Sequence, residues 1–188
     1  MNHPEVTLIT YTAEAEKLVC AAAKLCYAAD ASTVFDHGEG EVKTFLTRLR
    51  KMGHLSPFEH ASYTFLLEGV SRALTHQLVR HRIASYSQRS QRYVTHDTFD
   101  YIVPPSFEGK TVATEGGSVD AVEYYRSVMA ATADAYQRLL DALGGGGEEA
   151  KQDARYVLPN ATETKIIVSM NARELFHFFG ERLCMRAQ

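Results

Sequence analysis

Four arginines lie within the fourteen residues RHRIASYSQRSQRY, at positions 80–93. The wider segment, from Gly69 to His96, holds five arginines and three histidines but no aspartate or glutamate. Cations without local carboxylates must be matched by an external anion, by a carboxylate elsewhere in the fold or by water. A guanidinium suits a phosphate, and a glutamine amide suits the edge of a nitrogen heterocycle. The segment therefore indicates a local anion site.

Two other interpretations fit the same residues. The arginines could pair with carboxylates of neighbouring segments and form an ordinary basic surface loop. They could also bind RNA, because Tyr86 and Tyr93 lie among them and could stack on bases. The whole chain has 20 basic and 23 acidic side chains, and this net charge of −3 disfavours a broad nucleic-acid surface.

The residues give little support to nucleophilic or metal chemistry. Ser90 has no nearby carboxylate that could orient a histidine base, and the chain contains no GxSxG motif. His54 and His60 are six residues apart across a proline, which is a poor spacing for chelation. We therefore expect neither a serine nucleophile nor a metal site.

Cysteine usage and hydropathy bear on where the protein works. Cys20, Cys26 and Cys184 form no CxxC pair and lie in apolar helical contexts, which indicates reduced packing residues. The N-terminus lacks a basic stretch followed by an apolar one, and no apolar run approaches the length of a membrane span. These features predict a cytoplasmic protein without a membrane partner.

The candidate site residues must be positioned by a mixture of helices and strands. Apolar residues at three- and four-residue spacing predict helices over 13–29, 42–52, 71–82, 118–143, 148–158 and 171–188. Ser71 and Asn171 are the expected N-caps of two of them, and Gly53 is an expected left-handed C-cap. Alternating or continuous apolar runs predict strands over 6–11, 60–70, 101–105 and 164–170. The polar, Gly-rich stretches 108–117 and 144–147 are expected to be flexible loops within one domain.

Arg80, His81 and Arg82, followed by seven residues and Ser90, resemble the signature of the flavin-dependent thymidylate synthases. Three other segments are similar to that family: GHLSPFEHASYTF, ARYVLPNATET and NARELFHFFGERLCMRAQ. With the helix before the motif they cover most of the chain in the family's order. The resemblance implies an α+β fold like that of the thymidylate synthase-complementing proteins. Residues 1–188 would form a single domain whose central, mostly antiparallel sheet is flanked by helices.

The resemblance also implies the reaction. The family methylates dUMP to dTMP reductively, with 5,10-methylenetetrahydrofolate as carbon donor and FAD reduced by NADPH as hydride carrier. No enzyme nucleophile is needed, which agrees with the absence of a cysteine beside the arginine-rich segment. Arg182 would be the catalytic residue, placed near N3 and O4 of the pyrimidine, where it would stabilise negative charge on the base.

Binding roles follow from the same resemblance, position by position. The residues that would contact FAD are Ser56, Arg80, His81, Arg82, Ile83, Gln88, Asn171, Arg173 and His177, with His54 near the flavin. The residues that would bind dUMP are Gln77, Leu78, Val79, Arg80, Gln88, Arg89, Ser90, Gln91, Arg92, Arg155 and Arg182. The family often has glutamate at the position of Gln88 and asparagine at that of His177. Contacts there are expected to differ in polarity.

The last helix also has implications for assembly. At about 100° per residue, Arg173 and His177 lie about 40° apart, whereas Arg182 lies nearly opposite them. One helix would then serve flavin and base on different sides, so we expect active sites shared between subunits, in agreement with the homotetramer that the family implies. The family usually continues beyond Gln188, and we expect this domain to lack those C-terminal helical turns.

Overall fold

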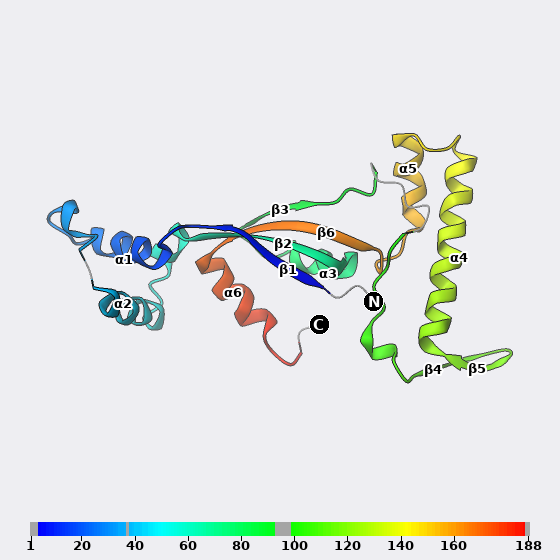
Figure 1. Cartoon of the computed structure of the whole chain (residues 1–188), viewed down its shortest axis with the longest axis horizontal. Coiled ribbons are helices and arrows are strands. Elements are labelled where there is room, and N and C mark those ends of the chain that lie inside the picture. The colour runs from blue at the N-terminus through cyan, green and yellow to red at the C-terminus, as the bar shows by residue number, and fades with distance from the viewer. Residues whose placement is uncertain (1–3, 37, 93–98, 187–188) are drawn as a thin grey trace. The chain divides into compact units, whose positions relative to one another are not determined.

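A computed structural model describes residues 4–36, 38–92 and 99–186, and its elements are labelled in Figure 1. The α-helices are α1 (Ala15–Leu25), α2 (Glu39–Lys51), α3 (Arg72–Leu78), α4 (Ala121–Ala142), α5 (Glu148–Ala154) and α6 (Ala172–Arg182). The strands are β1 (Glu5–Tyr11), β2 (Ser62–Ser71), β3 (Ala84–Gln88), β4 (Thr111–Thr114), β5 (Gly117–Asp120) and β6 (Glu163–Asn171). Four short 3₁₀ helices complete the list: η1 (Ala31–Thr33), η2 (Ser56–His60), η3 (Pro105–Phe107) and η4 (Arg155–Val157). The α+β class expected from the sequence is confirmed.

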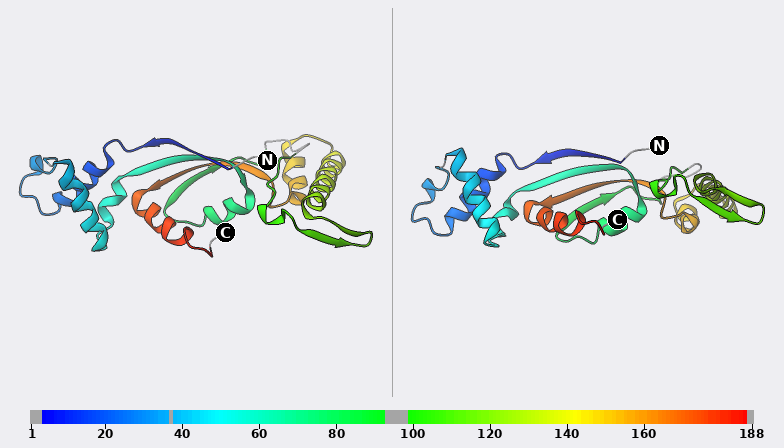
Figure 2. Two further views of the ribbon diagram at one scale, coloured as in Figure 1. Left: turned by 60° about the horizontal axis from the view of Figure 1, so that its bottom comes forward. Right: turned by 90° about the horizontal axis from the view of Figure 1, so that it is seen from below.

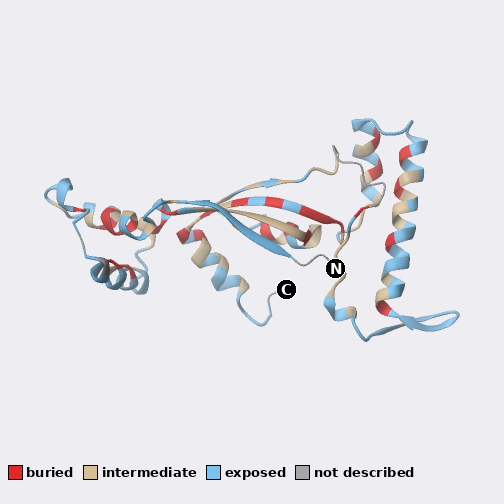
Figure 3. Cartoon of the chain, in the orientation of Figure 1, coloured by how far each residue is buried: buried red, intermediate tan, exposed pale blue. Residues whose placement is uncertain are grey.

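The main sheet has four strands in the order β1-β2-β6-β3 and is mostly antiparallel. Figure 2 shows β2 and β6 as its longest strands, running side by side. Along β6, Ile166, Val168 and Met170 are buried, whereas Lys165 and Ile167 are exposed (Figure 3). This alternation is the period-2 pattern of a strand with one covered face.

Most of the chain divides into two compact units. The first comprises residues 1–5, 67–77 and 88–166, and the second comprises 6–66, 78–87 and 167–188. Strands β2 and β6 contribute residues to both units. Each unit has its own apolar cluster and its own set of candidate site residues.

The second unit is built around α1, α2 and η2. Val19 of α1, Val42 and Leu46 of α2 and Phe58 of η2 form one buried apolar cluster, against which Phe176 of α6 packs. These residues recur at helical spacing in the sequence, which is why the helices turn them inward. Helix α2 ends at Lys51, two residues before a glycine with φ 76°, as the sequence predicts.

In the first unit, α4 and α5 pack together through Tyr136, Leu140, Ala150 and Ala154. Figure 3 shows the buried positions of α4 along one side of the helix. The side chain of Asp120 caps α4 by accepting from the N–H groups of its first turn, at 2.9 and 3.0 Å. The connection from α4 to α5 contains three successive glycines with positive φ, of 87°, 74° and 55°.

Several predicted elements differ from the structure. Residues 108–117 form no mobile loop: β4 pairs with β5 as an antiparallel hairpin, with Thr111 opposite Asp120. Residues 101–105 form an isolated bridge between Tyr101 and Thr162 rather than an edge strand. The helix expected over 148–158 ends as α5 at Ala154 and continues only as the short η4.

The helix expected over 71–82 is also shorter than predicted. Ser71 caps its start, since its Oγ accepts from the N–H of Leu74 at 3.1 Å, but α3 ends at Leu78. Residues 79–83 form a turn, and the residues after them form strand β3. Gln77 therefore lies in α3, whereas Arg80 and His81 lie in the turn after it and share no helical face with it. The last predicted helix ends at Arg182, and residues 187–188 lie outside the described part of the chain.

Candidate functional site

The turn over residues 79–83 is held together by backbone and side-chain hydrogen bonds in the second unit. The N–H of His81 donates to the carbonyl of Leu78 at 3.1 Å. The hydroxyl of Tyr86 lies 2.8 Å from that same carbonyl and 3.0 Å from the carbonyl of His81. Burial, and then the charge of Glu174, raise the pKa of Tyr86, so its hydroxyl keeps the proton that it donates to the turn. Arg80, Arg82 and Ile83 are exposed around this anchored turn.

His81 is the buried member of the turn and contacts the predicted catalytic arginine. Nε of Arg182 donates to Nε2 of His81 at 2.8 Å. An imidazole that accepts at Nε2 carries its proton on Nδ1, so the ring is neutral in this arrangement. Burial lowers the pKa of His81 first, and the adjacent Arg182 guanidinium lowers it further. A polar contact thus joins the turn over residues 79–83 to α6.

Helix α6 presents its other predicted site residues in different settings. The Asn171 side chain caps α6 by accepting from the N–H of Glu174 at 2.9 Å. Arg173 is exposed and forms an ion pair with Glu59 of η2. His177 is exposed, and its ring centre lies 6.1 Å from that of His81. The structure thus brings the ring of His177 toward that of His81.

His54 and Ser56, the remaining predicted flavin residues, line a cavity of about 480 Å³ in the second unit. Its walls also include the apolar side chains of Phe45, Leu49 and Met52. A cavity of this size with mixed polar and apolar walls suits part of an aromatic ligand.

In the first unit the loop after β3 meets α5 and η4. Oγ of Ser90 accepts from the N–H of Arg92 at 3.1 Å, which folds the loop back on itself. Nη1 of Arg92 donates to Oε1 of Gln152 at 3.3 Å, and Nε of Arg155 donates to the carbonyl of the same glutamine at 3.1 Å. Burial and the nearby Arg155 lower the pKa of Arg72, a third guanidinium at this place. The unit therefore gathers three guanidinium groups, a charge arrangement suited to an anion.

Gln88 lies at the end of β3 with its amide turned into the unit. Its Nε2 donates to the hydroxyls of Thr75 at 2.7 Å and of Thr164 at 3.3 Å. Both threonines are almost fully buried. In this structure both donor hydrogens of the amide serve the protein itself, and a contact between Gln88 and ligand stays a prediction.

Arg89 fits the surface-loop interpretation. Its Nη1 lies 3.7 Å from Oε2 of Glu163, which is buried and also accepts from the N–H of Gly69 at 3.2 Å. The carboxylate that this arginine lacks nearby in the sequence is supplied by β6. The other predicted dUMP residues are neighbours of these residues in the sequence: Gln77, Leu78, Val79 and Gln91.

Sequence reasoning missed three residues. Gln152 joins two arginines, but a single glutamine on a polar helix gives no signal in one sequence. Arg72 lies in the segment from Gly69 to His96 that has no aspartate or glutamate, but it was not assigned to the site. Glu174 was not assigned to the site, although it is buried and its charge raises the pKa of His81.

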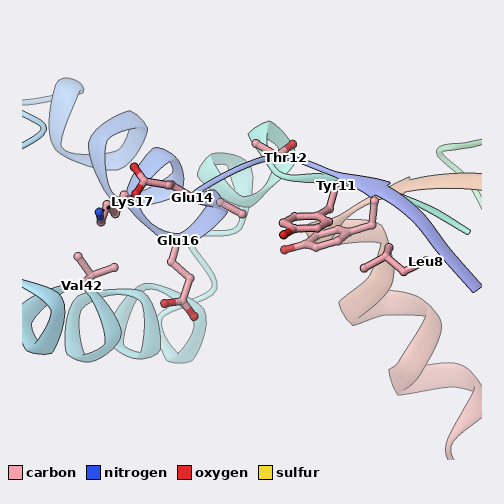
Figure 4. A pocket seen from close by; sticks show the side chains of 9 residues that line it. Leu8, Tyr11, Thr12, Glu14, Glu16, Lys17 and Val42 are labelled. Atoms are coloured by element: carbon pink, nitrogen blue, oxygen red, sulfur yellow. Dashed lines mark hydrogen bonds and ion pairs between the residues drawn. The ribbon is translucent and has the colours of Figure 1, made fainter.

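A further cavity in the second unit contains no predicted site residue. It measures about 630 Å³ and is shown in Figure 4, with Leu8 and Tyr11 projecting from β1, Glu16 from α1 and Val42 from α2. Lys17 pairs with Glu14 at 2.8 Å beside it.

The described residues offer neither a metal-binding cluster nor a membrane-spanning helix. Within 4–36, 38–92 and 99–186, no three His, Cys, Asp or Glu side chains cluster so as to hold a metal ion. None of the helices in that part of the chain combines the length and the apolar character that a membrane crossing requires.

The first unit thus holds a cluster of guanidinium groups of the kind that suits an anion, and the second unit joins His81 to Arg182. Residues 7–188 match the family model described as "Thymidylate synthase complementing protein". Proteins named flavin-dependent thymidylate synthase are similar over nearly the whole chain. The relative from Clostridium tetani is 48% identical over 98% of this chain and 76% of its own length. Those from Geobacter sulfurreducens and Pyrococcus furiosus are 50% and 42% identical, over 98% and 97% of this chain and 75% and 72% of their own lengths.

The chain belongs to the thymidylate synthase complementing protein family. The family predicted from the RHR motif and the three other segments is confirmed.

Proposed function

We propose that this chain is a flavin-dependent thymidylate synthase, which methylates dUMP to dTMP with 5,10-methylenetetrahydrofolate, NADPH and FAD. Family membership over residues 7–188 supports the activity. The contact between His81 and Arg182 is the structural observation that supports it most directly. It joins a predicted flavin residue to the predicted catalytic arginine although the two are 101 residues apart in the sequence.

In the proposed reaction Arg182 stabilises negative charge on the pyrimidine of dUMP. A guanidinium presents fixed donors to a carbonyl oxygen and a ring nitrogen, and this favours ionisation of the base. The contact with His81 fixes one edge of the guanidinium. Preorganised donors of this kind lower a barrier because they need not reorient as charge develops.

The phosphate of dUMP is proposed to bind at the cluster of Arg72, Arg92 and Arg155. Arg92 and Arg155 both donate to Gln152, through its side chain and its carbonyl, and Arg72 lies close enough to Arg155 for that charge to lower its pKa. Arg92 also lies 3.9 Å from the exposed carboxylate of Glu148. The cluster therefore retains positive charge for a phosphate.

The residues proposed for FAD fit that group by their chemistry. Exposed guanidinium groups of the 79–83 turn suit a diphosphate, and the cavity at His54 and Ser56 suits an aromatic ring. When bound, FAD reduced by NADPH supplies the hydride for the methyl group. The protein supplies position and electrostatics around it.

The cysteines support a mechanism without an enzyme nucleophile. Cys20 is buried, and burial raises the pKa of its thiol, which disfavours the reactive thiolate. Cys26 and Cys184 are exposed, and each thiol donates to a carbonyl of its own helical segment.

A homotetramer with shared active sites belongs to the same proposal. The partners of Arg173 and Arg182 on α6 differ, Glu59 for the first and His81 for the second. Apolar side chains of β1 are also 46% to 63% exposed: Val6, Leu8, Ile9 and Tyr11. Such a surface is typical of a subunit contact. A fully active monomer in light scattering would contradict this part of the proposal.

A cytoplasmic location and the absence of nucleic-acid and membrane partners complete the proposal. Three free cysteines support the location, because reduced thiols are typical of the cytosol. The net charge of −3 argues against general RNA binding.

Flavin absorbance and tritium release test the activity. The purified chain, supplied with FAD, should show the flavin absorption bands. It should release tritium from 5-labelled dUMP only when both methylenetetrahydrofolate and NADPH are present. A colourless protein that ignores FAD but binds RNA with steep salt dependence would instead favour the RNA interpretation.

A further inference from the structure

The side chain of Tyr86 reaches from β3 back to the turn that precedes this strand. Exposure alternates along β3, and Tyr86 is one of its half-buried positions, on the covered face of the strand. Its hydroxyl donates to the carbonyl oxygen of Leu78 at 2.8 Å and to that of His81 at 3.0 Å. One side chain therefore contacts both the end of α3 and the turn after it.

Both backbone polar groups of His81 are held in this way. Its N–H donates to the carbonyl of Leu78 at 3.1 Å, and its own carbonyl accepts from Tyr86. The last carbonyls of a helix have no donor within the helix, so a side-chain donor at this place stabilises the turn. The backbone of His81 is therefore fixed on both sides of its Cα atom.

The backbone in turn determines where the His81 ring lies. The residue is only 8% exposed, and its ring meets that of Phe178 edge to face, with centres 5.0 Å apart. Nε2 of the ring accepts from Nε of Arg182 at 2.8 Å. Hydrogen bonds weaken steeply when their angle departs from a straight line, so a tilt of the ring would shift or weaken this contact. Hydrogen bonds thus connect Tyr86, through His81, to Arg182.

Building on the function proposed above, we propose that Tyr86 is a positioning residue for Arg182. Its hydroxyl fixes the backbone of His81, and the His81 ring sets the orientation in which the Arg182 guanidinium meets the pyrimidine. Tyr86 itself touches no reacting atom in this proposal. Its contribution is to keep the donors of Arg182 preorganised.

Turnover at saturating FAD is the first test. Tyr86→Phe removes only the hydroxyl, and it should lower kcat for dTMP formation about tenfold, because a misplaced guanidinium stabilises charge on the base less well. KM for dUMP should change by less than about threefold, since the proposed phosphate cluster keeps its arginines. Replacement of Tyr86 by 4-aminophenylalanine, whose amino group can donate to both carbonyls, should recover most of kcat. This variant also serves as the second test if Tyr86→Phe does not fold.

Nuclear magnetic resonance shows whether the effect passes through Arg182. In the full chain, exchange of the Arg182 Nε–H with water should be about tenfold faster in Tyr86→Phe than in the unsubstituted protein, as expected when a hydrogen bond loses its alignment. The 4-aminophenylalanine variant should exchange at nearly the unsubstituted rate. An unchanged kcat or an unchanged exchange rate in Tyr86→Phe would overturn the proposal.

Tyr125→Phe is the matched control. The hydroxyl of Tyr125, a half-buried residue of α4 in the first unit, donates to the carbonyl of Ile102 at 3.0 Å. Its loss removes the same kind of hydrogen bond, but it should leave both kcat and the exchange at Arg182 unchanged. An equal loss of kcat in the control would mean that lower stability, not the position of Arg182, is responsible.

The exchange measurement also separates this inference from the proposed activity. An unsubstituted chain that makes no dTMP would refute the proposed function. The exchange rates at Arg182 in Tyr86→Phe and Tyr125→Phe would still decide whether Tyr86 positions Arg182.

Discussion

Arg182 donates from Nε to Nε2 of His81 at 2.8 Å, so the side chain proposed to activate the base rests on the side chain proposed to face the flavin. The two come from separate stretches of the second unit's sequence, the 79–83 turn and α6. A substitution of either residue should therefore affect the other.

Removal of Arg182 should stop catalysis without removing the flavin. In Arg182→Ala, we expect tritium release from 5-labelled dUMP to fall by at least about 100-fold, because the donors that stabilise charge on the base are lost. Flavin absorbance should stay. Arg182→Lys keeps the charge but lacks the planar fork, and it should recover only a minor part of the rate. Undiminished tritium release by Arg182→Ala would refute the assigned role.

Loss of either phosphate arginine should weaken dUMP binding selectively. Arg92→Ala and Arg155→Ala should each raise KM for dUMP roughly tenfold to hundredfold, the effect of one charge-assisted hydrogen bond. Flavin binding, measured by absorbance, should not change. Arg126→Ala is the control, since that exposed arginine on α4 pairs only locally with Glu123 at 2.7 Å. An equal rise of KM in the control would show that general charge, not the cluster, is responsible.

Replacement of Gln88 should reduce stability. In Gln88→Ala the buried hydroxyls of Thr75 and Thr164 lose their donor, so the free energy of unfolding should fall by about 1–3 kcal/mol. Urea unfolding measures this. Gln137→Ala removes an exposed amide that donates to Asp141 at 2.8 Å, and it should change stability by no more than about 0.5 kcal/mol. A stable Gln88→Ala protein with impaired dUMP binding would assign Gln88 to the ligand instead.

His81 should make stability depend on pH. Its pKa is lowered in the folded protein by burial and by Arg182. Below about pH 6.5 the unfolded chain therefore binds a proton that folded His81 resists, and the free energy of unfolding falls as the pH drops through that value. Above it this contribution is fully present. His81→Gln, which does not titrate but can still accept from Arg182, should lose less stability between about pH 7.5 and about pH 5.5 in urea unfolding. An identical loss in both proteins would contradict the assignment.

The sequence predicts elements best where a local cause decides them. Asn171 starts α6 as an N-cap, and the apolar spacing of α2 and α4 places their buried sides correctly. The hairpin β4–β5 was missed because its polar composition was weighed above its turn, where the hydroxyl of Thr114 donates to the carbonyl of Gly117 at 2.7 Å. Alternation across a Glu-Gly turn could have revealed it.

The limits of prediction at the site have a tertiary cause. The helical pattern of residues 71–82 continues past Leu78, but the hydroxyl of Tyr86 lies against the carbonyls of the turn and ends α3 there. The composition of the arginine-rich segment predicts an anion site, and this stays a prediction. Its arginines contact different partners, Glu163 for Arg89 and Gln152 for Arg92. Both partners lie far along the chain, and only folding brings them to the segment.

Gly144, Gly145 and Gly146, three of the four glycines between α4 and α5, have positive φ angles, which L-amino acids with a side chain rarely adopt. A methyl group built on each of them would meet nothing within 4 Å, so room is plentiful and chirality alone is the restriction. D-alanine would fit the connection where L-alanine would strain it. The direction in which α5 presents Gln152 to its two arginines thus depends on the handedness of a link made mostly of glycine.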